Sequence, residues 1–198
     1  MVKLLNDSPL LPHRIHYCRI RKKEAMSTTD KPLVNRIAAS GLITLKLEEF
    51  FPKAEIAKLD LKDYLFRELL LKEKDFREAM AVHNWEQYQG KILLVYCSTD
   101  AILPMWAFML VAAYAAPFAA DVFQGEEKDY YLAYYTKTLA ALDIEKYRDE
   151  RIIIKGCTDN KPIPANAYVE LVKRLRPLVK SIMYGEPCST VPIYKKPR

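Results

Sequence analysis

An internal repeat limits the folds that this chain can adopt. Residues 92–126 align with residues 152–186 without a gap, and seven positions are identical. Each copy contains a short aliphatic run, a helical segment that starts near a proline, and a second apolar run that ends at a glycine. This order predicts a strand, a crossover helix and a parallel strand in each copy. The identical positions that mark these boundaries are Cys97 with Cys157, Pro104 with Pro164, Pro117 with Pro177, and Gly125 with Gly185.

The segment before the first copy adds two strands and a helix. Apolar residues alternate with period two over 41–47 and 56–61, which predicts an N-terminal β-hairpin. Helical spacing of apolar residues predicts helices over 62–82 and 127–142. We therefore predict a single α/β domain over residues 31–197, with a mixed sheet and an N-terminal β-hairpin followed by two duplicated βαβ units.

The first 25 residues differ from the rest of the chain in charge. They carry six Lys and Arg against two Asp and Glu, whereas the whole chain has a formal net charge of +6. We interpret residues 1–25 as a non-native or disordered extension, with Met26 as the true start. The alternative is a basic arm that binds nucleic acid or an anionic membrane. Because the remaining residues carry only a small positive charge, we expect no nucleic-acid partner.

The composition excludes several classes of function. The five glycines lie too far apart for a phosphate-binding loop or a dinucleotide fingerprint, so we expect no nucleotide. Only three histidines are present, which disfavours histidine-based hydrolysis. The start of the chain lacks the apolar core of a secretory signal, and no Cys-x-x-Cys pair occurs. We expect a cytoplasmic protein with reduced thiols.

Residues 101–120 contain no charged side chain, which raises the question of a membrane span. The corresponding residues 161–180 carry several Lys, Arg and Glu, so we predict a helix covered on both faces and no membrane contact. Two alternatives remain for what covers this helix: the N-terminal elements of the same chain, or the same helix of a second copy in a homodimer. The candidate interface residues are Trp106, Leu110, Ala113 and Tyr114.

Three cysteines follow predicted strands. Cys97 and Cys157 come at the end of the first strand of each copy, and Cys188 follows the last strand. If the second βαβ unit is parallel, Cys157 and Cys188 emerge at the same edge of the sheet. One hypothesis is a thiolate-bound metal, an iron–sulfur cluster or a persulfide held by these cysteines. The other is that they are small buried hydrophobic residues. The candidate supporting residues are Asp100, Asp159, Glu186 and His83.

The sequence resembles the bacterial domain-of-unknown-function family 2480. The resemblance covers residues 31–197 and depends on four segments, which are 34–43, 73–77, 97–107 and 181–192. The family has no established activity, so the resemblance implies no catalytic roles. It implies an association with iron–sulfur assembly genes, and hence iron–sulfur assembly proteins as partners.

Together these observations favour an accessory protein in iron–sulfur or sulfur handling that uses thiolates at strand ends. The alternative is a non-catalytic structural or interaction protein, dimeric through the helix in residues 101–120, with inert cysteines. A third option, an enzyme with a cysteine nucleophile, needs a base that only His83 or a carboxylate supplies. The sequence identifies no catalytic residue, so the question of enzymatic activity stays open.

Overall fold

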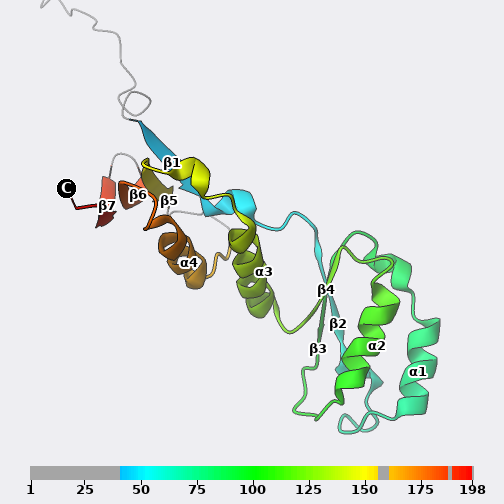
Figure 1. Cartoon of the computed structure of the whole chain (residues 1–198). Coiled ribbons are helices and arrows are strands. Elements are labelled where there is room, and N and C mark those ends of the chain that lie inside the picture. Colours follow the sequence, from blue (N-terminus) through cyan, green and yellow to red (C-terminus); the bar gives the residue numbers. More distant parts are fainter. Residues whose placement is uncertain (1–40, 156–160, 187–188, 198) are drawn as a thin grey trace, which may run out of the picture. The chain divides into compact units, whose positions relative to one another are not determined.

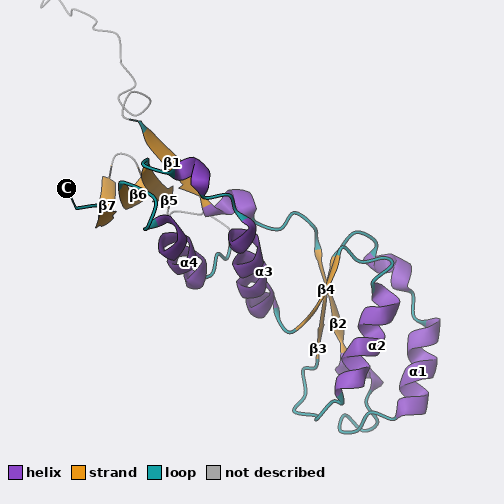
Figure 2. Ribbon diagram, viewed as in Figure 1, coloured by secondary structure: helices purple, strands orange, loops and turns teal. Residues whose placement is uncertain are grey.

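The structure is a computed structural model that describes residues 41–155, 161–186 and 189–197. These residues form four α-helices and two β-sheets, one parallel and one mixed (Figures 1 and 2). The predicted α/β class is confirmed, and the structure has two sheets where we predicted one. The predicted extension over residues 1–25 lies outside the described residues.

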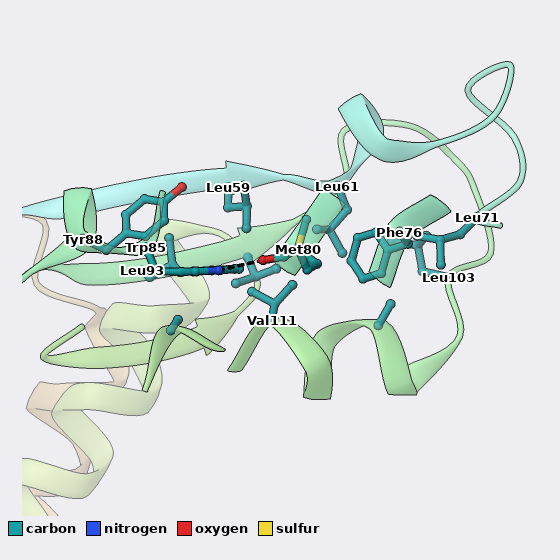
Figure 3. Close-up of a cluster of buried hydrophobic side chains, with 13 residues drawn as sticks. Leu59, Leu61, Leu71, Phe76, Met80, Trp85, Tyr88, Leu93, Leu103 and Val111 are labelled. Atoms are coloured by element: carbon teal, nitrogen blue, oxygen red, sulfur yellow. Dashed lines mark hydrogen bonds between the residues drawn. The ribbon is translucent and has the colours of Figure 1, made fainter. Parts of the chain in front are cut away.

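The three-stranded sheet has the order β2-β3-β4, and all its strands are parallel. The central strand β3 is buried along almost its whole length, as is typical of parallel sheets with both faces covered. Helices α1 and α2 pack on one face, where Phe76, Met80 and Val111 belong to the same buried cluster as Leu93 (Figure 3). The elements are β2 (Ile56–Asp60), α1 (Glu73–Val82), β3 (Ile92–Tyr96), α2 (Met105–Ala115) and β4 (Asp121–Gln124).

The four-stranded sheet has the order β1-β5-β6-β7, with β7 antiparallel to β6. Helices α3 and α4 pack on one face, and Leu139 and Leu171 are buried there against Ile152 and Ile154. The elements are β1 (Leu42–Lys46), α3 (Glu127–Ala141), β5 (Arg151–Lys155), α4 (Ala165–Leu175), β6 (Ser181–Glu186) and β7 (Ser189–Lys195).

Helix α3 contributes to the cores of both sheets. Near its start, Tyr130 and Tyr131 cover Ile92 and Leu94 on the face of the three-stranded sheet away from α1 and α2. One turn later, Tyr135 is completely buried in the core of the four-stranded sheet. Its hydroxyl donates a hydrogen bond to the main-chain oxygen of Leu47, at 3.0 Å. The run of tyrosines in this helix is therefore core material.

The predicted N-terminal hairpin is wrong. Strand β1 pairs in parallel with β5, and β2 pairs in parallel with β3, so the two strands belong to different sheets. The sequence suggested a hairpin because both strands alternate with period two and are close along the chain. Their true partners follow much later in the sequence, where a pattern of alternation gives no pairing information.

The two sheets instead reveal that the repeat is longer than predicted and is nested. In both, a strand leads into a 3₁₀ helix, Leu47–Phe50 after β1 and Leu61–Tyr64 after β2. A helix, a strand, a second helix and a second strand then follow. Along the chain, the whole unit that forms the three-stranded sheet stands between the 3₁₀ helix at Leu47–Phe50 and helix α3, which both belong to the unit of the four-stranded sheet.

The gap-free alignment of the two copies also needs one correction. Helices α2 and α4 correspond at the expected offset, but β3 starts at Ile92 and β5 starts at Arg151, one residue earlier than aligned. The pairing shows the same shift, because Leu93 lies beside Val122 whereas Ile152 lies beside Ile182. The loop after β5 is therefore one residue longer than the loop after β3.

Two further predictions are corrected. Of the helix expected over 62–82, only the second half is α-helical, as α1. Arg67 and Glu68 have φ angles of 53° and 58°, which a right-handed helix does not allow. Residues Ser189–Lys195, for which we predicted no strand, form β7, which pairs with β6 across a two-residue connection. Helix 127–142 is found as predicted, as α3.

We expect the core under α4 to dominate the stability of the four-stranded sheet. Leu171 is 1% exposed, so Leu171→Ala should lower the free energy of unfolding by about 2–5 kcal/mol through lost burial and a cavity. Val169 lies on the same helix with 54% of its surface exposed, and Val169→Ala should change it by less than about 0.5 kcal/mol. Urea unfolding followed by circular dichroism measures both, and equal losses would contradict the assignment of the core.

Candidate functional site

Cys97 directly follows β3, at the carboxyl end of the three-stranded sheet. It is half-buried, and its Sγ lies 3.2 Å from Oγ1 of Thr99. The main chain beside it is held by Asp60 at the end of β2, whose Oδ1 accepts hydrogen bonds from the N–H of Ser98 and the N–H of Lys62. Burial acts to raise the pKa of Asp60, but a hydrogen bond with the side chain of Ser98, the two main-chain hydrogen bonds and the charge of Lys62 together outweigh it, and the pKa is lowered. The ionised carboxylate thus fixes the turn after Cys97.

Cys157, Asp159 and Cys188 lie outside the described residues, but the strands that lead to them are described. Strand β5 ends at Lys155 and β6 ends at Glu186, and the two are adjacent and parallel. Nζ of Lys155 forms an ion pair with Oε1 of Glu186, at 3.3 Å. The second βαβ unit is therefore parallel, which was the condition for Cys157 and Cys188 to follow the same edge of one sheet. Cys97 follows a strand of the other sheet.

The same edge of the four-stranded sheet carries a carboxylate that we did not predict. Glu48 lies in the 3₁₀ helix after β1, and among the described residues its buried Oε1 has no hydrogen-bond partner. Its main-chain oxygen accepts a hydrogen bond from Nζ of Lys161, at 3.2 Å. The spacing of an isolated glutamate gives no sign of such burial, so only the parallel pairing of β1 with β5 places it here.

A hollow of ≈ 560 Å³ opens between the starts of α3 and α4. It is lined on one side by Tyr131 and Leu132, and on the other by Ile163 and Pro164, which follow the loop after β5. Its size is in the range of small-molecule sites. The N-termini of both helices border it, and helix N-termini favour anionic groups.

Three of the predicted supporting residues are described, and each lies in a different part of the fold. Asp100 is exposed in the loop after Cys97, and Glu186 is engaged by Lys155. His83 ends α1, and its ring lies between two tyrosines: Nδ1 is 3.2 Å from the hydroxyl of Tyr64, and Nε2 is 3.0 Å from that of Tyr88. The described part of the chain contains no cluster of three or more His, Cys, Asp or Glu side chains able to hold a metal ion.

Two of the four predicted interface residues, Trp106 and Leu110, are partly covered by their own chain. Trp106 packs edge-on against Phe76 of α1, and Tyr114 stacks on Trp85, with ring centroids 5.6 Å apart. Leu110 packs against the same core, and Ala113 is exposed. The N-terminal elements thus cover part of this face of α2, at Trp106 and Leu110, and leave Ala113 and Tyr114 exposed. None of the described helices has the length and apolar character to span a bilayer.

A neighbouring surface of the same unit is apolar and exposed, and we missed it. Leu71 and Leu103 are buried side by side where the loops after β2 and β3 meet (Figure 3). The residues around them point outward: Ile102 is 96% exposed and Leu69 is 74% exposed. The exposed side chains, which we call the loop–α2 surface, are Phe66, Leu69, Leu70, Ile102, Met105 and Met109.

A signal for this surface was present in the sequence. Ile102, Met105 and Met109 recur at helical spacing within the uncharged segment. From the sequence, we assigned the outer side of that helix to the candidate interface residues, because they align with polar and charged residues of the second copy. The structure shows that the covered side and the exposed side of α2 are both apolar.

These features define a class of protein: an α/β protein built from two nested copies of one unit, with cysteines after the carboxyl ends of its strands. The model of the family described as "Protein of unknown function (DUF2480)" matches residues 31–196. The chain belongs to this family, which confirms the resemblance seen in the sequence. No curated protein and no solved structure matches the chain significantly.

The histidine between the two tyrosines should make stability depend on pH. Burial lowers the pKa of His83 below its ordinary value of 6.5, so the unfolded chain binds a proton more readily than the folded one. The contribution of the neutral ring is therefore present above pH 6.5 and is lost as the pH falls through the lowered pKa. We expect the melting temperature to drop less in His83→Gln than in the wild type between about pH 7.5 and 5.5. Identical drops in differential scanning fluorimetry would contradict this.

Proposed function

We propose that the protein is an accessory protein in sulfur or iron–sulfur handling, with Cys157 and Cys188 as its reactive thiols. One observation carries the proposal: the strands before these cysteines are adjacent and parallel, and their last residues, Lys155 and Glu186, form an ion pair. A single residue separates each cysteine from the nearer member of that ion pair. Two cysteines that follow so closely after the residues of one ion pair are within reach of a common ligand.

The surroundings of this edge suit thiolate chemistry. A nearby cation and a helix N-terminus both favour the thiolate over the thiol. Lys155 supplies the cation, and α4 begins at Ala165, soon after Cys157. Glu48 adds a buried carboxylate oxygen with no partner among the described residues. The hollow between α3 and α4 gives room for a small sulfur-bearing substrate.

The proposed set of thiols is narrower than the three cysteines first considered. Cys97 follows a strand of the other sheet and is half-buried beside Thr99, so we assign it no role in the site. Two thiolates with one carboxylate leave a ligand position open on a bound metal or cluster, which suits transfer better than permanent storage. Iron–sulfur assembly proteins are the partner class that this role requires, and the cytoplasm is the compartment that keeps such thiols reduced.

The test is anaerobic purification of the full chain, followed by analysis of metal, labile sulfide and sulfane sulfur and by an absorption spectrum. We expect sulfur or metal bound in the wild type and in Cys97→Ser, and a loss to background in Cys157→Ser and in Cys188→Ser. Cys97→Ser is the matched control because that residue also follows a strand.

The proposal fails if the wild-type protein carries no metal, sulfide or sulfane sulfur, and its cysteines react with iodoacetamide only after unfolding. It also fails if Cys97→Ser removes the bound species as completely as the other two substitutions. Mass spectrometry of alkylated peptides assigns the reactivity of each cysteine separately.

A second candidate function is favoured by the loop–α2 surface. We propose, as the alternative, an interaction protein that dimerises through this surface. Contiguous exposed apolar residues on a soluble domain mark contact sites. The surface is continuous with an uncharged helix, so a second copy of the same face meets no like charge along α2. Met105 and Met109 supply flexible side chains that adapt to a partner.

Light scattering on the full chain tests this alternative. We expect a dimer for the wild type and a monomer for Met109→Glu, because the substitution buries an unpaired charge at the interface. Val169 occupies the corresponding position of α4 and is also exposed, so Val169→Glu should stay dimeric. A monomeric wild-type protein overturns the alternative.

A further inference from the structure

Another hollow, of ≈ 550 Å³, lies along one side of α3 beside strand β4, and we call it the β4–α3 hollow. It shares no lining residue with the hollow between the starts of α3 and α4. Strand β4 contributes Asp121 and Phe123 to its lining, and Leu142 follows α3. The lining residues on α3 recur at helical spacing and so share one side of the helix. They are Tyr130, Ala133, Tyr134, Lys137, Thr138 and Ala141.

Three aromatic rings form an apolar wall of the β4–α3 hollow. The rings of Phe123 and Tyr130 meet edge to face, with centroids 5.4 Å apart. The ring centroid of Tyr134 lies 5.8 Å from that of Tyr130. Tyr130 is held firmly, because it belongs to the same buried cluster as Ile92 and Leu94 of the three-stranded sheet. Such a wall can receive a further ring or an ammonium group.

The β4–α3 hollow also carries one side chain of each charge. The carboxylate of Asp121 lies near the hydroxyl of Tyr130, and burial together with this negative charge raises the pKa of Tyr130. The tyrosine therefore stays neutral, and the negative charge belongs to Asp121. Lys137 lies on the same side of α3, two turns after Tyr130. Neither Asp121 nor Lys137 is in an ion pair with any residue that the structure describes.

We propose that the β4–α3 hollow binds a small zwitterion of the amino-acid type, with its ammonium group against Asp121, its carboxylate against Lys137 and its apolar part on the aromatic wall. Lys137 repels a ligand that is only cationic, and Asp121 repels one that is only anionic, so a ligand with both charges complements the hollow best. The side chain of Lys137 tilts toward the start of the helix, and hence toward the aromatic wall.

The size and the remaining lining of the β4–α3 hollow fit such a ligand. Its volume is in the range of small-molecule sites. Ala133 and Ala141 are exposed, and their small side chains leave the space beside the rings open. The hydroxyls of Tyr134 and Thr138 add groups that can donate or accept hydrogen bonds. None of the described lining residues is a cysteine, so this site does not depend on the proposed thiol chemistry.

Nuclear magnetic resonance titration of the full, isotope-labelled chain tests the proposal with three probes of similar shape. They are L-phenylalanine, phenethylamine, which lacks the carboxylate, and phenylpropionate, which lacks the ammonium group. We expect changes in the amide signals of β4 and of the lining residues of α3. The affinity for L-phenylalanine should exceed that for either of the other two probes by about fivefold, since each lacks one of the two charge pairs.

Two substitutions test where the two charges of the ligand lie. Asp121→Asn should weaken L-phenylalanine and phenethylamine by about fivefold and should not weaken phenylpropionate. Lys137→Gln should weaken L-phenylalanine and phenylpropionate by a similar factor and should not weaken phenethylamine. Both side chains are exposed, so neither substitution disturbs the core. Lys74→Gln is the matched control, because Lys74 is exposed on α1 and does not line the hollow, and it should change none of the affinities.

The proposal is overturned if none of the probes changes the amide signals at millimolar concentrations, or if the changes are confined to other elements. It is also overturned if the three probes bind equally, or if the two substitutions weaken all three alike. Ala133→Trp gives an independent test, because it fills the hollow and leaves both charges in place. It should weaken all three probes, and unchanged affinities would place the binding elsewhere and overturn the proposal.

Discussion

Helix α3 packs different side chains into the cores of the two sheets, and both units depend on this packing. Tyr130 and Tyr131 close the second face of the three-stranded sheet, while Tyr135 and Leu139 belong to the core of the four-stranded sheet. A helix with these duties needs large side chains on more than one side, and tyrosine provides apolar area with a hydroxyl that reaches a polar partner. The buried hydroxyl of Tyr135 is satisfied by the main chain of the 3₁₀ helix after β1.

The nested repeat explains which predictions from the sequence succeeded. Both βαβ units were predictable because their strands and helices are close along the chain and carry clear apolar periods. The partners of β1 and β2 were not, since their pairing depends on strands that follow a whole unit later. The positive φ angles of Arg67 and Glu68 also leave no mark in the sequence, because neither residue is a glycine or asparagine.

At the candidate site, the sequence predicted that Cys157 and Cys188 follow one edge of a sheet, but not that Cys97 follows a strand of the other sheet. Cysteines that follow strands are visible in a sequence, whereas the sheet to which each strand belongs is not. The one-residue difference between the loops after β3 and β5 shows why apparent equivalence is a weak guide. Because strand faces alternate, a shift of one residue moves a side chain to the opposite side of a sheet. Cys97 and Cys157 match in the alignment, yet their positions after the strands differ.

The nesting of one unit inside the other also orders the synthesis of the fold. Every strand of the three-stranded sheet has been synthesised once Gln124 is added, before synthesis of β5 begins. Strand β1, the first of the described strands to be synthesised, remains without its neighbour β5 until the whole three-stranded unit has been made. Unpaired strand edges invite wrong partners during that interval. A nascent chain of this design is thus most exposed to misassembly at its first strand, long after that strand has been translated.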